Sequence, residues 1–267
     1  MNSPDRRSTQ LKLALLLPIV SLLVLAACTR ADVAQYAYKV TGKIPQPREN
    51  FVQGLQILDG HLYVSTGNYG ESKLLRYRLS DGKLLAGRNV DKRLFAEGLT
   101  VLGDRIFQLT WRSHLVLIYN KEDLKGLEYF RIPGEGWGLT NNGSDLIYSD
   151  GSHRLHYLSP KTKSITRTIS VTESGNPVTM LNELEWINGE RWANIWQQNR
   201  IIMINPDTGN VTGSVNLQGL LPGEEKLPGT DVLNGIAFNP QDNTVWVTGK
   251  RWPWLYQIEL ISTRAQR

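Results

Sequence analysis

Cysteine and histidine are scarce in this sequence, which has one cysteine and four histidines among its 267 residues. A single cysteine excludes a disulfide within the chain. The histidines are scattered, and no group of His, Asp and Glu has the spacing of zinc ligands, which argues against a zinc-dependent enzyme. The chain also lacks a Gly-x-Ser-x-Gly nucleophile elbow and a glycine-rich phosphate loop, so nucleophilic hydrolysis and phosphate binding are not indicated.

A strong excess of one charge sign is absent as well. The formal net charge is +5, and the residues after position 27 carry 27 basic against 24 acidic side chains. Because this excess is weak and scattered, the sequence does not predict nucleic-acid binding. With 40% hydrophobic and 21% charged residues, the body of the chain has the composition of an ordinary globular protein.

The first 27 residues have the features of a secretion signal. Arg6, Arg7 and Lys12 form a basic segment, and an apolar stretch follows over residues 13–27. This stretch is shorter than the roughly 20 residues that a membrane-spanning helix needs. We therefore expect residues 1–27 to be a signal peptide that is removed on export.

The signal ends in Leu25-Ala26-Ala27-Cys28, which resembles the lipobox of bacterial lipoproteins. The resemblance implies a diacylglyceryl group on Cys28, a lipidated tether over residues 28–35, and attachment at the periplasmic face of the bacterial cell envelope. Thr29 stands where an Asp would favour the inner membrane, so by analogy the outer membrane is expected. An ordinary cleaved signal with a chance cysteine is the alternative.

A short phrase recurs five times after the signal, at intervals of 40 to 52 residues. Each copy has a polar or aromatic residue, then a small or acidic one, then an aliphatic one. A turn sequence and an alternating strand follow each copy, which is typical of β-hairpins. The copies are Gln53-Gly54-Leu55, Glu97-Gly98-Leu99, Trp137-Gly138-Leu139, Asn182-Glu183-Leu184 and Asn234-Gly235-Ile236.

Five units of this length predict an all-β protein, a five-bladed β-propeller with four antiparallel strands per blade over residues 36–262. Second strands are expected at 61–66, 105–110, 145–149, 191–195 and 244–248, and third strands at 74–79, 115–119, 155–158, 201–204 and 255–260. The last unit lacks an outer strand, and residues 36–44 are expected to supply it, so that an N-terminal strand closes the ring and removes two sheet edges. A β-sandwich is the alternative, but it does not explain the repeat.

The register of the repeat predicts a polar site at one mouth of the axis. The first residues of the five phrases should meet around the axis, and a second ring of residues lies fourteen positions further on, or slightly more in the last unit. The long segments 173–181 and 218–233 should wall this mouth. The alternative is that the amides bond strand ends and the indoles fill the core. The two rings are Gln53, Glu97, Trp137, Asn182 and Asn234, and Gly67, Trp111, Gly151, Trp196 and Lys250.

Eight ordered segments of the chain resemble the glutaminyl-peptide cyclotransferases of the plant and bacterial type, over essentially all of residues 45–260. One departure is Phe-Ala-Glu at 95–97, where Phe-Gly-Glu is expected. The segments are Phe51-Val-Gln-Gly-Leu55, Ser65-Thr-Gly-Asn-Tyr-Gly-Glu-Ser72, Phe95-Ala-Glu-Gly-Leu-Thr100, Gln108-Leu-Thr-Trp111, Gly136-Trp-Gly-Leu-Thr140, Leu181-Asn-Glu-Leu-Glu185, Trp192-Ala-Asn-Ile-Trp196 and Thr248-Gly-Lys-Arg-Trp-Pro253.

The resemblance implies a five-bladed propeller enzyme, an acyltransferase of the aminoacyltransferase class that needs no metal and no cofactor. Such an enzyme converts the N-terminal glutaminyl residue of a peptide or protein to pyroglutamate and releases ammonia. The resemblance places the catalytic carboxyl at Glu97, and we expect a monomer. It places the substrate-binding residues at Gln53, Trp111, Trp137, Asn182, Trp196 and Lys250.

Lactam closure assigns a role to each of these side chains. Glu97 would carry a proton from the α-amine to the leaving nitrogen, with its pKa raised by the neighbouring indoles. Asn182 and Lys250 would polarise the γ-carbonyl oxygen as charge develops on it. Gln53 would orient the substrate, and the three tryptophans would enclose the glutamine side chain.

Two other functions remain open from the residues alone. A calcium-dependent propeller lactonase or hydrolase would use the oxygens of Glu97, Asn182 and Asn234, although one carboxylate is little charge for a tightly held divalent cation. A non-enzymatic envelope lipoprotein would use the propeller as a scaffold for protein partners. Such a scaffold has no need for a carboxylate, an amine and three indoles at one mouth.

Overall fold

The computed structural model of the chain describes residues 32–263, and these are strands, turns and loops apart from one short 3-10 turn, η1 (Gly223–Glu225). The all-β prediction is confirmed. The predicted signal peptide and Cys28 lie outside the described residues. Within residues 32–263, no helix is long and apolar enough to cross a membrane.

Three antiparallel sheets each contain four strands in chain order. The predicted bounds His61–Thr66 and Arg105–Thr110 are those of β3 and β7. The turn between β2 and β3 has both Asp59 (φ 52°) and Gly60 (φ 72°) in the left-handed region, as tight hairpin turns require. The strands are β2 (Val52–Leu58), β3 (His61–Thr66), β4 (Lys73–Arg78) and β5 (Leu84–Asn89); β6 (Ala96–Leu102), β7 (Arg105–Thr110), β8 (Leu115–Asn120) and β9 (Gly126–Arg131); and β10 (Leu139–Asn141), β11 (Leu146–Ser149), β12 (Arg154–Ser159) and β13 (Ser164–Ser170).

The remaining long strands form one eight-stranded sheet in the order β16-β17-β18-β19-β1-β22-β21-β20. Its two halves meet at β1, the first strand of the described chain. The strands are β16 (Leu181–Ile187), β17 (Glu190–Ile195), β18 (Arg200–Ile204), β19 (Val211–Asn216), β20 (Leu233–Asn239), β21 (Thr244–Gly249), β22 (Trp254–Ser262) and β1 (Ala34–Pro45).

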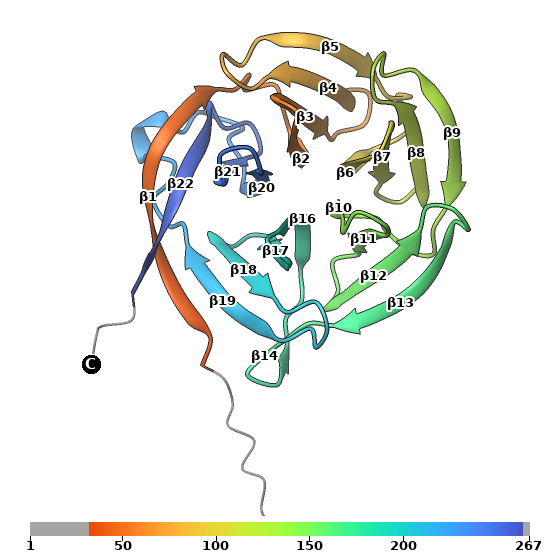
Figure 1. Cartoon of the computed structure of the whole chain (residues 1–267). Helices are drawn as coiled ribbons and strands as arrows, with labels where there is room; N and C mark the ends of the chain where they lie inside the picture. Colours follow the sequence, from red (N-terminus) through yellow and green to blue (C-terminus); the bar gives the residue numbers. More distant parts are fainter. Residues whose placement is uncertain (1–31, 264–267) are drawn as a thin grey trace, which may run out of the picture. The chain divides into compact units, whose positions relative to one another are not determined.

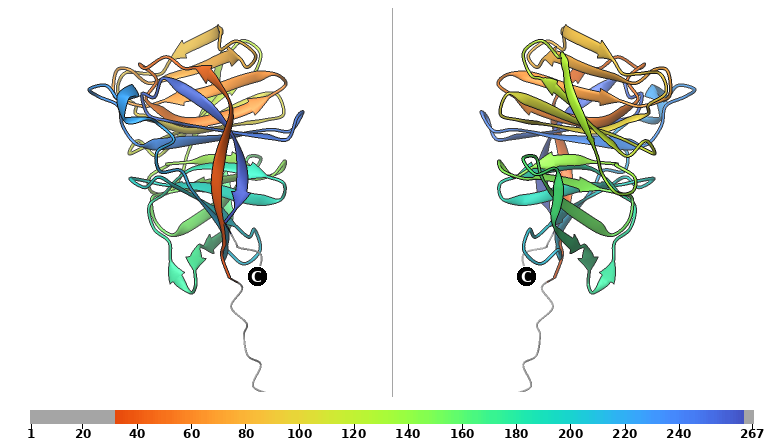
Figure 2. Two further views of the ribbon diagram at one scale, coloured as in Figure 1. Left: turned by 90° about the vertical axis from the view of Figure 1, so that its left-hand side faces the viewer. Right: turned by 90° about the vertical axis from the view of Figure 1, so that its right-hand side faces the viewer.

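The N-terminal strand β1 pairs with the C-terminal strand β22, as the sequence predicts. The antiparallel register runs from Tyr36 opposite Ser262 to Pro45 opposite Trp254, and β1 lies beside β22 at the outer side of the sheets (Figures 1 and 2). A second pairing was not predicted: residues 34–36 of β1 also run parallel to residues 213–215 of β19. Residues 34 and 35, assigned to the tether from the sequence, therefore belong to the sheet.

The segment expected as a plain loop over residues 173–181 contains a small hairpin. Its strands, β14 (Thr172–Glu173) and β15 (Asn176–Pro177), are joined by a turn with Ser174 (φ 52°) and Gly175 (φ 83°) in the left-handed region. Two-residue strands carry no alternation, so periodicity could not predict them. The hairpin lies outside the ring of sheets in Figure 1.

The inner strands contact one another in a closed cycle, β2 with β6, β6 with β10, β10 with β16, β16 with β20 and β20 with β2. Figure 1 shows the sheets arranged around this central axis. Five apolar clusters fill the spaces between neighbouring units; one, for example, packs Leu55 and Val64 against Ala237 and Trp246. The apolar faces of the sheets therefore bury one another around the axis.

The second residue of each phrase lies where the inner strands approach most closely. A Cβ added to Gly98 would lie 2.4 Å from Leu139 N, and one added to Gly138 would lie 1.9 Å from Asn182 O. In β16 this position is Glu183, which is fully buried and accepts backbone N–H groups of Leu55 (3.2 Å) and Ile236 (2.8 Å). Its carboxyl group thus ties β16 to both β2 and β20.

Candidate active site

Four of the five first-ring residues lie where the inner strands lose their regular register, and the fifth, Trp137, precedes β10, whose pairing is regular. Irregularities fall between Val52 and Gly54, and at the corresponding places in β6, β16 and β20. Bulges of this kind re-aim side chains, and they concentrate beside active sites. They direct the phrase residues away from the ordinary alternation of the strand. The residues within the irregular segments are Gln53, Glu97, Asn182 and Asn234.

One cavity of about 740 Å³ contains all seven side chains that the family resemblance assigns to the site. Its size falls within the range of about 300–1,000 Å³ for ligand pockets. From the two segments predicted to wall the mouth, 173–181 and 218–233, only Met180, Asp231 and Val232 line this cavity. The seven are Gln53, Glu97, Trp111, Trp137, Asn182, Trp196 and Lys250.

Glu97 is a buried carboxyl group held by a short chain of amides. Gln53 Nε2 donates to Glu97 Oε1 at 3.1 Å, and Gln53 Oε1 accepts from Asn234 Nδ2 at 3.1 Å. Asn234 belongs to the predicted ring but does not line the cavity. It lies behind Gln53, so its position suits orienting Gln53 rather than touching a ligand.

Burial perturbs the two charged groups of the cavity in opposite directions. It raises the pKa of Glu97 well above its ordinary value, and nearby Lys250 opposes this shift. It lowers the pKa of Lys250, and Glu97 opposes that shift in turn. Both side chains are at least 94% buried, at 6% and 5% exposure. Burial therefore disfavours the charged form of both groups, a perturbation that is common among acid–base catalysts.

Asn182 lines the cavity and has a buried side-chain acceptor without a partner among the described residues. Its side chain is 3% exposed, and its buried Oδ1 has no hydrogen-bond partner among the described residues. Its backbone carbonyl is fixed by Ser149 Oγ at 2.8 Å. A buried acceptor without a partner costs free energy, so a donor on a bound ligand would relieve this cost.

Glu135, which the sequence analysis did not single out, holds two of the three indoles. Its Oε2 accepts from Trp111 Nε1 at 2.7 Å and from Trp137 Nε1 at 2.9 Å. Although burial opposes the shift, these bonds and Arg112 lower the pKa of Glu135. Trp196 packs edge-on against Trp137, with ring centroids 5.8 Å apart. The Glu135 carboxylate therefore fixes the indoles of Trp111 and Trp137, and Trp196 is held by its contact with Trp137.

Other residues of the cavity were missed because they lie outside the two rings. Phe51 and Phe95 each stand two positions before a ring residue, and this shared spacing is a signal that could have found them. Phe95 packs on Trp111 at 5.6 Å, and Lys250 Nζ lies 4.9 Å from the Phe51 ring centroid. Asp150, which is bonded to His156 at 3.0 Å, gives no comparable sequence signal.

At three positions of the second ring, the next residue in the chain has its backbone in the left-handed region, with a positive φ. Non-glycine residues seldom adopt this conformation, and where it persists it often marks a functional site. The residues are Asn68 (φ 84°), Gln197 (φ 66°) and Arg251 (φ 60°), which directly follow Gly67, Trp196 and Lys250.

Only two of the three oxygen ligands predicted for a calcium-dependent hydrolase line the cavity. Glu97 and Asn182 line the cavity, but Asn234 does not. Across residues 32–263, no group of three or more His, Cys, Asp and Glu side chains could hold a metal ion.

Comparison with known proteins gives a consistent result. The model of the glutamine cyclotransferase family matches residues 13–260. Glutaminyl-peptide cyclotransferase of Arabidopsis thaliana is 38% identical over 234 residues, which cover 85% of this chain and 72% of the plant protein. The crystal structure of Myxococcus xanthus glutaminyl cyclase superposes with a TM-score of 0.81 at 31% identity, covering 87% of this chain and all of the other.

Proposed function

This chain belongs to the glutamine cyclotransferase family, and we infer that it converts an N-terminal glutaminyl residue to pyroglutamate with release of ammonia. The observation that carries the inference is one buried carboxyl group, Glu97, in a cavity walled by three indoles. The reaction needs no external nucleophile, because the α-amine and the γ-carboxamide belong to one molecule. The protein chiefly has to hold the two groups in a near-attack geometry and move one proton.

Glu97 is the proposed proton carrier. The neutral α-amine attacks the γ-carbon, and the C–N bond of the lactam forms as the amine loses a proton to the Glu97 carboxylate. The carboxylic acid then protonates the leaving nitrogen, so that the old C–N bond breaks with departure of ammonia. Gln53 donates a hydrogen bond to Oε1 of Glu97. No described residue donates to Oε2 of Glu97, so this oxygen is available for the proton transfer. The raised pKa of Glu97 suits it to act as both base and acid.

The other polar groups are proposed to act on the γ-carboxamide. Lys250 and the amide N–H of Asn182 stabilise the negative charge that develops on its oxygen. The unpaired Oδ1 of Asn182 accepts an N–H of the substrate. Trp111, Trp137 and Trp196 enclose the methylene groups and exclude water, which strengthens these interactions.

The proposed architecture is a five-bladed propeller. The closed cycle of five inner strands and the apolar cluster at each interface support it. In this description β16–β19 are the fourth blade, and β20–β22 with β1 are the fifth. The parallel contact between β1 and β19 then joins two blades, which makes one continuous sheet.

We further propose that the enzyme acts in the bacterial cell envelope. A signal peptide over residues 1–27 and a lipid on Cys28 would hold it at the periplasmic face, with the outer membrane as the expected destination. There it would meet exported peptides and proteins whose N-termini begin with glutamine. The support is the sequence of the first 29 residues.

A mass measurement tests the function directly. Purified protein is incubated with a Gln-initiated peptide, with and without EDTA, and the peptide mass and free ammonia are followed. We expect one ammonia to be lost per peptide at the same rate in both arms. An unchanged peptide mass would favour a scaffold, and loss of activity in EDTA would favour a metal-dependent enzyme.

A further inference from the structure

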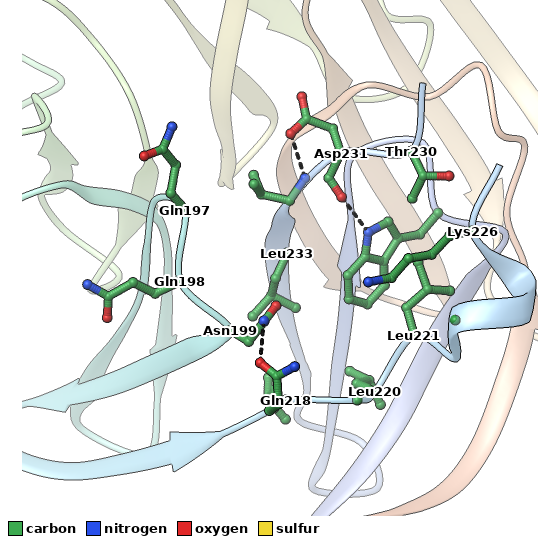
Figure 3. A pocket seen from close by; sticks show the side chains of 15 residues that line it. Gln197, Gln198, Asn199, Gln218, Leu220, Leu221, Lys226, Thr230, Asp231 and Leu233 are labelled. Carbon is green, nitrogen blue, oxygen red and sulfur yellow. Dashed lines mark hydrogen bonds between the residues drawn. The ribbon is translucent and has the colours of Figure 1, made fainter. Parts of the chain in front are cut away.

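A second pocket opens beside the active-site cavity, between the loop after β17 and the long loop before β20 (Figure 3). Its volume is about 470 Å³, enough for part of a peptide. Gln197, Asp231 and Val232 line this pocket and the active-site cavity alike. The two spaces therefore share a wall.

This shared wall is built directly onto the site residues. Gln197 follows Trp196 in the chain. Asp231 N donates to Lys250 O at 3.1 Å, and Lys250 N donates to Val232 O at 2.9 Å. A peptide chain advances at most about 3.6 Å per residue. A glutaminyl residue held by Lys250 and Trp196 would therefore place the next residues of its peptide at this wall.

Side-chain amides make up much of the rim of the pocket. Asn199 Nδ2 donates to Gln218 Oε1 at 2.7 Å, a bond drawn in Figure 3. The exposed side chains of Gln197 and Gln198 have no hydrogen bond to any described residue. An amide side chain offers both a donor and an acceptor, and so does each peptide unit of a bound chain. The rim therefore suits the main chain of a peptide, whatever its side chains.

The floor of the pocket is apolar and fixed. Leu220, Leu221 and Trp252 are each at least 95% buried. Trp252 Nε1 donates to Asp231 O at 2.9 Å, which ties the floor to the shared wall. A fixed floor reduces the ordering that binding requires.

We propose that this pocket binds the second and third residues of the peptide substrate through their main chain. The proposal rests on the proposed function, since the first residue must be the glutaminyl residue in the active-site cavity. The enzyme then prefers peptides to glutaminamide, with little selectivity for the side chains that follow. Length rather than sequence of the peptide sets the rate at low substrate concentration.

The test compares kcat/KM for glutaminamide with kcat/KM for a Gln-Ala-Ala-Ala amide. In the unaltered protein we expect the tetrapeptide to be favoured by about tenfold or more, as a few neutral hydrogen bonds provide. Combined Gln198→Ala and Gln218→Ala should lower kcat/KM for the tetrapeptide by about tenfold and change that for glutaminamide by less than about twofold. Gln241→Ala, an exposed glutamine in another turn, is the matched control and should change neither.

Activity on glutaminamide also reports that the double variant is folded. Equal kcat/KM for the two substrates in the unaltered protein would overturn the proposal. So would an equal loss on both substrates, or no loss on either, in the double variant. Absence of ammonia from both substrates in the unaltered protein would instead contradict the proposed function itself.

Discussion

Glu97 and Lys250 line the same cavity, and each opposes the effect of burial on the pKa of the other. Because Lys250 lowers the pKa of Glu97, its removal should raise that pKa further. The ionised form of Glu97 is needed to accept the amine proton. The acid limb of kcat/KM against pH should therefore lie well above the ordinary value of 4.5 for a glutamate.

Lys250→Met should move this acid limb to higher pH. The measurement is kcat/KM for a Gln-initiated peptide from pH 5 to pH 9, in the variant and the unaltered protein. The α-amine of the substrate titrates near 8 in both and serves as an internal reference. The limb reports the coupled pair rather than one residue. An unshifted limb, or one that moves to lower pH, would contradict the assignment of the pair.

Glu135 should matter although it belongs to neither predicted ring. Glu135→Ala removes the acceptor that Trp111 and Trp137 share, so both indoles lose their fixed orientation. We expect kcat/KM to fall by about tenfold, a modest figure because the carboxylate is partly exposed and screened. Glu135→Gln, which keeps an acceptor, should restore much of the loss. Arg112→Ala removes the ion pair with Glu135 and the contact of Arg112 with the Trp111 ring, and an equal loss there would contradict the assignment of the effect to the indole hydrogen bonds alone.

The strands were easier to predict than the positions where they depart from regularity. β3 and β7 follow from plain alternation between a turn and a polar segment. The irregular registers that re-aim Gln53, Glu97 and Asn182 leave no mark in that alternation. The seven cavity residues were found because they recur at fixed offsets or match the family. Glu135 stands two positions before Trp137, the same offset as Phe51 and Phe95 from their ring residues, but only the folded contacts reveal that it is the shared acceptor of two indoles.

The inner strands also carry buried carboxyl groups that serve the fold. Glu185 of β16 accepts Phe238 N of β20 at 3.0 Å, and burial raises its pKa to about 8. In the unfolded chain the same group ionises near 4.5. Between these two pH values the folded state holds a proton that the unfolded state has lost. The free energy of unfolding should therefore fall as pH rises from about 4.5 to 8.

Glu185→Gln should reduce this pH dependence. One carboxyl group contributes at most about 1.4 kcal/mol per pH unit within its window. Urea unfolding at pH 5.5, 6.5 and 7.5 measures the slope in the variant and in the unaltered protein. Glu97 and Glu183, whose pKa values are also raised by burial, contribute in the same direction, so a residual slope is expected in the variant. Identical slopes would show that Glu185 is ionised in the folded state.

On the scale of the whole molecule, the ring of sheets gathers residues that are far apart in sequence. Gln53 and Lys250 lie at opposite ends of the described chain, yet both line one cavity with Glu97. Pairing of β1 with β22 and β19 ties the N-terminal strand to the C-terminal strand and joins the two halves of the eight-stranded sheet. The proposed catalysis therefore depends on closure of the ring as well as on each side chain.

The most direct test of the account is the rate of ammonia release by Glu97→Gln in a single turnover with a Gln-initiated peptide. Gln keeps an acceptor for Gln53 but carries no proton between the two nitrogens. We expect the rate to fall by about 10²–10⁴-fold, with no decrease in thermal stability and with Glu122→Gln, an exposed glutamate, retaining full activity. A rate within about tenfold of the unaltered protein would contradict the role of Glu97 as the proton carrier.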